Sequence, residues 1–69
     1  MENLIRELRE QQQMTQEELA IKVGVSRQTI ISLEKEKYNP SIMLAYKLAK
    51  VFSLSIEEVF IFEAKGEGE

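Results

Sequence analysis

Residues 16–35 carry the signals of two short helices joined by a tight turn, and this pair limits what the rest of the chain can build. Thr15 and Glu18 stand at the positions of a capping box, so the first helix is predicted to begin at about Gln16. Gly24 follows the last apolar residue of that helix, where glycine adopts a left-handed conformation at no steric cost. The first helix is therefore expected to end there.

The second helix is predicted to run from Arg27 to Lys35, with Ser26 as its cap. Apolar residues at helical spacing form one inward set across the pair: Leu19, Ala20, Val23, Val25, Ile30 and Leu33. The polar residues left outward at the front of the second helix have side chains able to bond base edges, namely Arg27, Gln28, Thr29 and Ser32. These are the predicted base-reading residues.

The spacing of Ala20, Gly24 and Ile30, together with the segments TQEELA, VSRQTI and LEKEKYNP, resembles the phage-repressor-like (Cro/cI, or XRE) regulators. The resemblance covers roughly residues 4–59. It implies an all-α, five-helix, phage-repressor-like helix-turn-helix domain that binds double-stranded DNA.

The resemblance also implies that the loop after the second helix grips the sugar-phosphate backbone. Free N–H groups in the first turn of a helix favour an anion. Gln16 lies in the first turn of its helix, so it is predicted to contact a phosphate as well. The predicted phosphate-binding residues are Gln16, Ser26, Lys35, Lys37, Tyr38 and Asn39. The alternative is that these polar side chains are only solvated. Glu36 stands where related sequences often carry glycine, which leaves the usual left-handed cap in question.

Composition excludes several other classes of function. The 69 residues make one small domain, and they include no cysteine, histidine or aspartate, so disulfides, the usual zinc sites and most catalytic constellations are ruled out. We expect no enzyme, no metal and no cofactor. No apolar run approaches the roughly 20 residues of a membrane span. With no signal peptide recognisable at the start, a cytoplasmic protein is expected.

The net charge of −3 argues against DNA as a partner only until its distribution is considered. Residues 1–21 sum to −3, residues 22–50 to +4 and residues 51–69 to −4. Positive charge is thus concentrated on the second helix and the segment after it.

The first residues, 1–13, show helical spacing and are predicted to form a covering helix, with Leu4 and Leu8 inward and Ile5 as a third candidate. In the family that the chain resembles, an arginine on this helix pairs with a glutamate late in the reading helix. The resemblance implies a pair between Arg9 and Glu34. The alternative is two solvated surface charges.

A fourth helix is predicted over Ile42–Phe52, with Ser41 as its cap. Its expected inward residues are Ala45, Leu48, Ala49 and Phe52, which leaves Met43, Leu44 and Tyr46 as apolar residues that cannot all share that face. Capping signals at Ser55 and Glu58 predict a short fifth helix over about residues 56–59.

Phe60–Glu63 are β-formers with partial alternation. We predict a short strand that pairs with its copy in a second subunit, which would make Phe60, Ile61 and Phe62 dimerisation residues. The alternative is a continued helix that tucks the two phenylalanines onto the monomer core. The helix-turn-helix domain with its dimerisation segment is assigned to residues 1–63, and residues 64–69 to a disordered acidic tail.

The sequence thus predicts a regulator that binds a near-palindromic operator through the major groove as a homodimeric repressor. A second hypothesis is an antitoxin-like or scaffolding interaction module, supported by exposed Met43, Leu44 and Tyr46 and by the acidic tail. No sensor domain is recognisable in the sequence, so regulation by an unidentified second protein is a further possibility. The sequence does not indicate the operator, the regulated gene or an effector.

Overall fold

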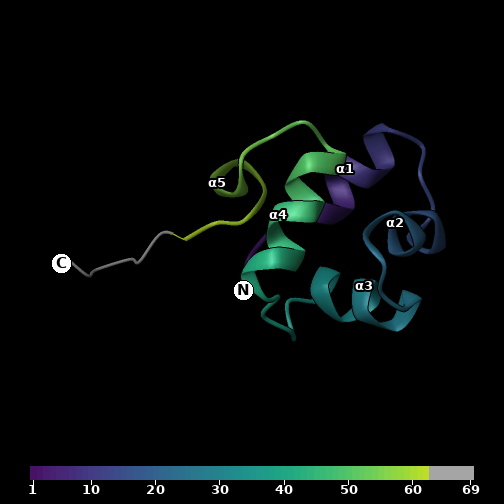
Figure 1. Ribbon diagram of the computed structural model, residues 1–69, viewed down its shortest axis with the longest axis horizontal. Coiled ribbons are helices and arrows are strands. Elements are labelled where there is room, and N and C mark those ends of the chain that lie inside the picture. The colour runs from purple at the N-terminus through teal and green to yellow at the C-terminus, as the bar shows by residue number, and fades with distance from the viewer. Residues whose placement is uncertain (63–69) are drawn as a thin grey trace, which may run out of the picture.

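The computed structural model describes residues 1–62 and contains five helices in that range (Figure 1). The helices are α1 (Ile5–Gln11), α2 (Gln16–Val23), α3 (Arg27–Glu34), α4 (Ile42–Val51) and α5 (Ile56–Val59). The α2–α3 pair lies at one end of the molecule and α5 at the other, with α4 between them (Figure 1). The predicted five-helix fold is confirmed. None of the helices in the described range is long and apolar enough to cross a membrane.

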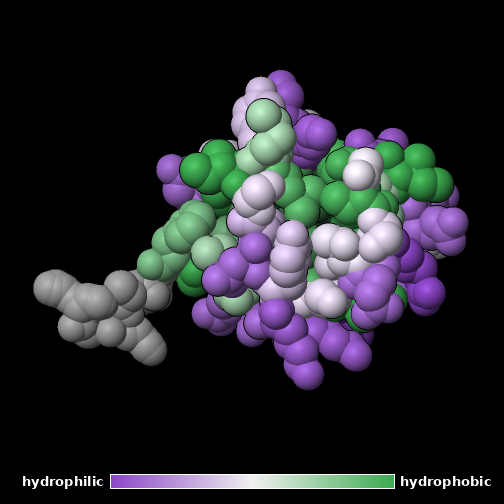
Figure 2. All heavy atoms as spheres, turned by 60° about the horizontal axis from the view of Figure 1, so that its bottom comes forward, coloured by the Kyte–Doolittle hydropathy of each residue, from purple (hydrophilic) through white to green (hydrophobic). Residues whose placement is uncertain are grey.

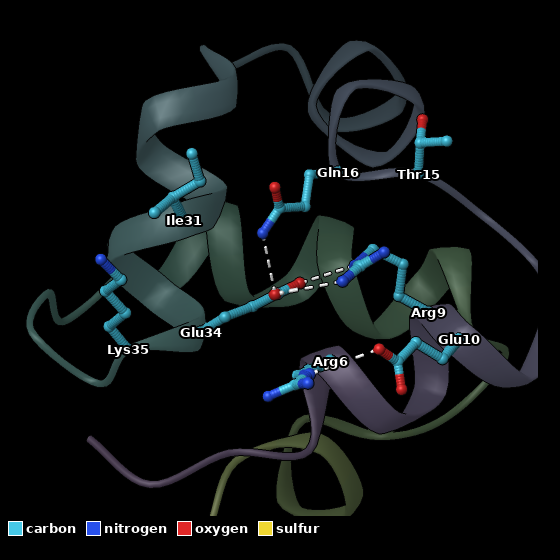
Figure 3. A pocket seen from close by; sticks show the side chains of 8 residues that line it. All are labelled: Arg6, Arg9, Glu10, Thr15, Gln16, Ile31, Glu34 and Lys35. Carbon is cyan, nitrogen blue, oxygen red and sulfur yellow. Dashed lines mark hydrogen bonds and ion pairs between the residues drawn. The ribbon is translucent and has the colours of Figure 1, made fainter.

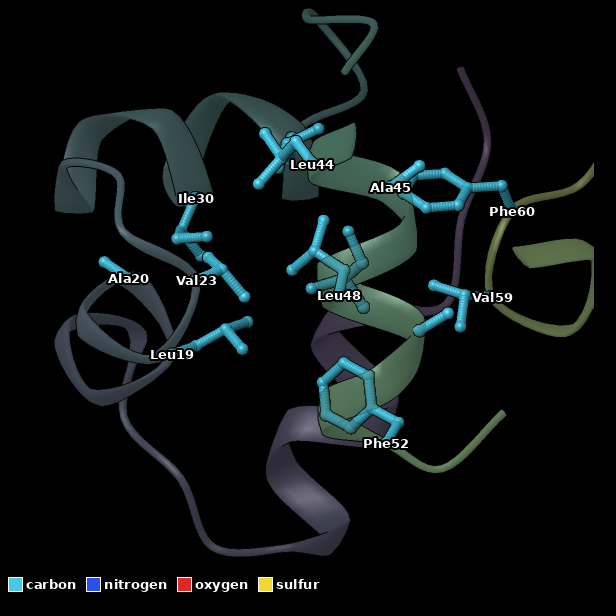
Figure 4. Close-up of a cluster of buried hydrophobic side chains, with 13 residues drawn as sticks. Leu19, Ala20, Val23, Ile30, Leu44, Ala45, Leu48, Phe52, Val59 and Phe60 are labelled. Carbon is cyan, nitrogen blue, oxygen red and sulfur yellow. The ribbon is translucent and has the colours of Figure 1, made fainter. Parts of the chain in front are cut away.

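The core is one cluster of apolar side chains to which every helix contributes. Leu48 of α4 lies at its centre, between side chains of α2 and α3 on one side and those of α5 on the other (Figure 4). The buried residues are Ile5, Leu19, Ala20, Val23, Ile30, Leu33, Leu44, Ala45, Leu48, Ala49, Phe52, Val59 and Phe60. The inward set predicted for the α2–α3 pair is therefore buried, with Val25 half-buried at its edge. A single core fixes the direction in which α3 presents its outer face.

Two predictions about inward residues were wrong. In α1 the buried residue is Ile5, whereas Leu4 is exposed because the helix begins only after it and Leu4 is the N-cap. Leu8 is half-buried as a packing neighbour of the core. In α4, Leu44 is buried, because the inward face is wider than predicted and includes Leu44 beside Ala45, just as it includes Leu48 beside Ala49. Met43 and Tyr46 remain exposed.

The segment after α5 does not form the predicted dimer strand at Phe60. Its backbone is extended there, but the side chain is 1% exposed and packs in the core of its own subunit. Phe60 forms an isolated antiparallel bridge with Asn3. Two bonds flank this bridge: Leu4 N–H donates to Val59 O at 2.8 Å, and Ile61 N–H donates to Glu2 O at 2.9 Å. The edge predicted to pair between subunits is thus occupied by the N-terminus of the same chain.

The alternative of a continued helix is also not what the structure shows, since Phe60 has φ −109° and ψ 139°. Ile61 and Phe62 are exposed, and their part in dimerisation stays a prediction. Glu63 and the predicted acidic tail, residues 64–69, lie outside the described residues.

Four helices end in the same left-handed turn, but glycine occupies only one of these turns. Gly24 after α2 has φ 75°, as predicted. The corresponding residues after α1, α3 and α4 are Gln13, Glu36 and Ser53, with φ of 55°, 61° and 58°. A side chain in this conformation costs on the order of 1 kcal/mol, so three turns are formed against a local preference.

Candidate nucleic-acid interface

Both helices of the α2–α3 pair begin at the predicted caps. Thr15 Oγ1 accepts a hydrogen bond from Glu18 N–H at 3.0 Å, and Glu18 Oε1 accepts one from Thr15 N–H at 2.8 Å. Ser26 Oγ accepts a bond from Thr29 N–H at 3.2 Å and lies 3.0 Å from Thr29 Oγ1. The two hydroxyls at the start of α3 are therefore engaged with each other, although both were predicted to contact DNA.

The other predicted base-reading residues lie on the outer side of α3. Arg27 and Gln28 are exposed, and Ser32 is half-buried one turn further along. Within residues 1–62, neither Arg27 nor Gln28 forms a side-chain hydrogen bond or ion pair. Figure 2 turns this side of the molecule toward the viewer and shows that hydrophilic side chains dominate it. Arg27 and Gln28 thus present donors and acceptors that have no partner in the part of the chain that the structure describes.

A hollow of about 460 Å³ lies beside α3, bounded by α1, the start of α2 and the outer face of α3 (Figure 3). We call it the α1–α3 hollow. Its lining consists of Arg6, Arg9, Glu10, Thr15, Gln16, Ile31, Glu34 and Lys35. The hollow brings together two residues predicted to bind phosphate, Gln16 and Lys35, from different helices.

The pair implied between Arg9 and Glu34 is confirmed. Arg9 Nε donates to Glu34 Oε2 at 2.7 Å, and Arg9 Nη2 donates to Glu34 Oε1 at 3.3 Å (Figure 3). The two side chains are only 12% and 6% exposed. The hydrogen bond with Glu34 raises the pKa of Arg9 above its usual value, although burial acts in the opposite direction. This bidentate pair joins α1 to the C-terminal end of α3.

Gln16 is connected to the same carboxylate. Its Nε2 donates to Glu34 Oε1 at 3.1 Å, so the side chain reaches across the hollow from α2 to α3 (Figure 3). Arg9 Nη1 also donates to Met14 O at 2.8 Å, which fixes the connector before α2. Glu34 thus sets the relative positions of α1, α2 and α3. For phosphate, the start of α2 offers the N–H groups of Gln16 and Glu17 and the remaining amide hydrogen of Gln16, since Glu18 N–H is bonded to Thr15 Oγ1.

The loop after α3 contains the remaining predicted phosphate-binding residues. Lys35, Lys37, Tyr38 and Asn39 are all exposed. Glu36 adopts the left-handed conformation, so the cap that glycine usually provides forms here with a glutamate. Its N–H donates to Leu33 O at 2.9 Å, and Lys37 N–H donates to Ser32 O at 3.0 Å. The chain turns sharply at this point, and the lysines lie next to the end of α3.

Two residues of this region were not predicted. Ile31 is half-buried and lines the α1–α3 hollow between Gln16 and Lys35, where its side chain is an apolar surface on the outer face of α3. Its spacing from Gln28 and Lys35, three and four residues, was the available signal.

Asn3 Nδ2 donates to Leu33 O at 2.9 Å, while Asn3 Oδ1 accepts from Ile5 N–H at 3.1 Å. Asn3 therefore attaches the N-terminus to the end of α3, and no local sequence pattern predicts this contact.

Comparisons with known proteins agree with this architecture. The sequence model of the helix-turn-helix family matches residues 5–59. An HTH-type transcriptional regulator of Archaeoglobus fulgidus is 62% identical over 63 residues, which cover 91% of this chain and 90% of the relative. The cryptic phage CTXphi transcriptional repressor RstR of Vibrio cholerae is 36% identical over 55 residues, covering 80% of this chain and 50% of the repressor.

Solved structures show the same fold. The restriction-modification controller protein C.AhdI of Aeromonas hydrophila superimposes with a TM-score of 0.72 at 31% identity, covering 78% of this chain and 82% of that protein. A chain of the SinR–SinI complex superimposes with a TM-score of 0.76 at 26% identity, covering 94% of this chain and 64% of that one. The chain belongs to the helix-turn-helix family of DNA-binding transcriptional regulators.

Proposed function

We propose that the protein is a homodimeric repressor that binds a near-palindromic DNA site, with α3 in the major groove. The observation that carries this proposal is the exposure of Arg27 and Gln28 at the front of α3, where neither side chain has a bonding partner among residues 1–62, on a helix held in place by the bond network of Glu34. The repressor named among the relatives supports the direction of regulation. We further propose that the protein has no enzymatic activity and no cofactor, and that it binds DNA in the cytoplasm.

In this proposal, Arg27 and Gln28 read base edges. The Arg27 guanidinium bonds guanine O6 and N7, and the Gln28 amide bonds adenine N6 and N7, each with about 1–3 kcal/mol of discrimination. Lys35, Lys37 and the start of α2 hold phosphates on either side, which sets the register without reading sequence. A two-fold dimer places two copies of α3 about 34 Å apart, one helical turn of DNA.

Selection of bound sequences from a random duplex library tests the proposal and gives the half-site spacing. Arg27→Ala and Gln28→Ala should each weaken binding and relax the preference at one base pair per half-site. Lys37→Ala is the matched control: it should weaken binding to all sequences alike and lower the salt slope by about one. Equal losses on every sequence for all three variants would contradict direct reading, and the absence of any salt-sensitive binding would contradict DNA binding itself.

A regulatory partner protein is a secondary element of the proposal. The solved complex of SinR with SinI shows that a regulator of this fold is found together with a second protein. In this chain, Ile42 and Met43 at the start of α4 are apolar and exposed, and they form a surface on which a partner can dock.

A further inference from the structure

A second concave surface lies between α2 and α4, with a volume of about 580 Å³. We call it the α2–α4 groove. It is lined by Ile21, Lys22, Val23, Gly24, Tyr46, Lys47, Lys50 and Val51. None of these residues lines the α1–α3 hollow, and α3 contributes nothing to the groove. The groove is therefore a surface separate from the proposed DNA contact.

The groove combines apolar surface with positive charge. Ile21 is 72% exposed and Tyr46 is half-exposed, so two large apolar side chains face solvent there. Lys22, Lys47 and Lys50 are exposed, and no carboxylate is among the lining residues. Neither ion pair found within residues 1–62 includes these lysines, and Lys50 Nζ lies 5.8 Å from the centre of the Tyr46 ring. The groove suits an apolar segment flanked by acids.

This chain contains such a segment at its other end. Ile61 and Phe62 follow α5 and are exposed, Phe62 by 54%. Two exposed acidic residues lie in the segments that adjoin them: Glu57 on α5, and Glu2, whose backbone carbonyl accepts the Ile61 N–H. We call residues 61–62 with these two glutamates the acidic C-terminal edge. Its apolar pair and negative charges complement the floor and rim of the groove.

The edge cannot enter the groove of its own subunit. Phe60 is fixed in the core and bridged to Asn3, so the residues that follow it leave the molecule beside the N-terminus. This exit lies on the opposite side of α4 from α2 (Figure 1). A second copy of the chain has the same edge without this restriction.

We infer that the acidic C-terminal edge of one subunit docks in the α2–α4 groove of a second subunit. The inference rests on the proposed homodimer and names its surfaces. In a two-fold dimer the contact forms twice, so both apolar pairs and both lysine rims are covered. The three lysines of the groove then lie near the two glutamates of the edge across the interface, which favours the correct partner and orientation.

Charge reversal tests the contact in the full chain. The dissociation constant of the dimer is measured by analytical ultracentrifugation for Lys47→Glu/Lys50→Glu and for Lys35→Glu/Lys37→Glu, a control with the same change in net charge outside the groove. The groove variant should dissociate at least about tenfold more readily than the control, because like charges then face each other. Adding Glu2→Lys/Glu57→Lys to the groove variant should restore the dimer. Equal dissociation of the two lysine variants, or no restoration, would overturn the inference.

A duplex carrying one half-site separates this inference from the proposed function. The groove variant should bind the half-site as the unaltered chain does, since the groove lies apart from α3. If it instead loses half-site affinity and salt dependence, the lysines hold phosphate and the inference fails. A chain that binds half-sites yet stays monomeric at every concentration also refutes it, while a chain that dimerises but binds no DNA refutes only the proposed function.

Discussion

Replacing the nearly buried Glu34 by alanine should destabilise the domain more than replacing any exposed charged residue does. The carboxylate accepts hydrogen bonds from Arg9 Nε, Arg9 Nη2 and Gln16 Nε2, and its side chain is 6% exposed. In Glu34→Ala, the guanidinium of Arg9 keeps only its bond to Met14 O, in a site where it is 12% exposed. A nearly buried charge that loses its partner costs about 3 kcal/mol or more.

That loss is large for a chain of this size. Domains of this length have unfolding free energies of roughly 3–10 kcal/mol. With a urea dependence near 1 kcal/mol per molar, typical of the smallest domains, the midpoint of unfolding should fall by about 3 M. Urea unfolding followed by circular dichroism measures this shift.

The chain contains a matched control in a second ion pair. Arg6 Nε and Glu10 Oε2 lie 3.3 Å apart, but their side chains are 68% and 57% exposed. Glu10→Ala should therefore cost no more than about 0.5 kcal/mol. Replacing both partners of the buried pair, in Arg9→Met/Glu34→Leu, should recover most of the loss, because no charge is left without a partner. A Glu34→Ala midpoint that falls no further than that of Glu10→Ala would refute the reasoning.

Three further predictions concern the turns, the C-terminal segment and Ile31. Glu36→Gly should stabilise the domain by about 1 kcal/mol and Gly24→Ala should destabilise it by a similar amount, because both sites are left-handed; urea unfolding that shifts in the same direction for both would contradict this. Phe60→Ala should cost about 3–5 kcal/mol of unfolding free energy and Phe62→Ala less than about 0.5 kcal/mol in the dilute monomer, and equal losses would contradict the difference in burial between the two side chains. The exposed surface of Ile31 is expected to contact thymine methyl groups. Replacing thymine by uracil in the selected site should then weaken DNA binding by the unaltered chain by about 0.8 kcal/mol per methyl group contacted, but should not change DNA binding by the Ile31→Ala variant. A loss of the same size in the variant would assign the methyl contact to another residue.

The helices and most of the core were predictable because their signals are local. Thr15, Ser26 and Ser41 cap the helices that they were expected to cap, and Gly24 has the expected conformation. The periodic apolar pattern of α2 and α3 likewise identified the buried side of each helix. Each of these signals lies within a few residues of the structure that it determines, so one sequence suffices to find it.

What the sequence did not reveal depends on partners far along the chain. Phe60 is a β-forming residue, so the sequence predicts that its backbone pairs with another segment. Only the fold shows that this segment is the N-terminus of the same subunit. The bond from Asn3 to the end of α3 and that from Gln16 to Glu34 also join separate segments. Polar side chains such as Gln16 have the same appearance in sequence whether they bind a phosphate or a neighbouring residue.

The pairing of residues 2–4 with residues 59–61 has a consequence for synthesis of the protein. Translation supplies residues 2–4 well before it adds their backbone partners and the side chains of Val59 and Phe60. Until those residues leave the ribosome, Ile5 and α4 lack part of their packing. The domain therefore completes its fold only after Phe60 has left the ribosome, and a truncation before Val59 destabilises the whole domain and not merely its end.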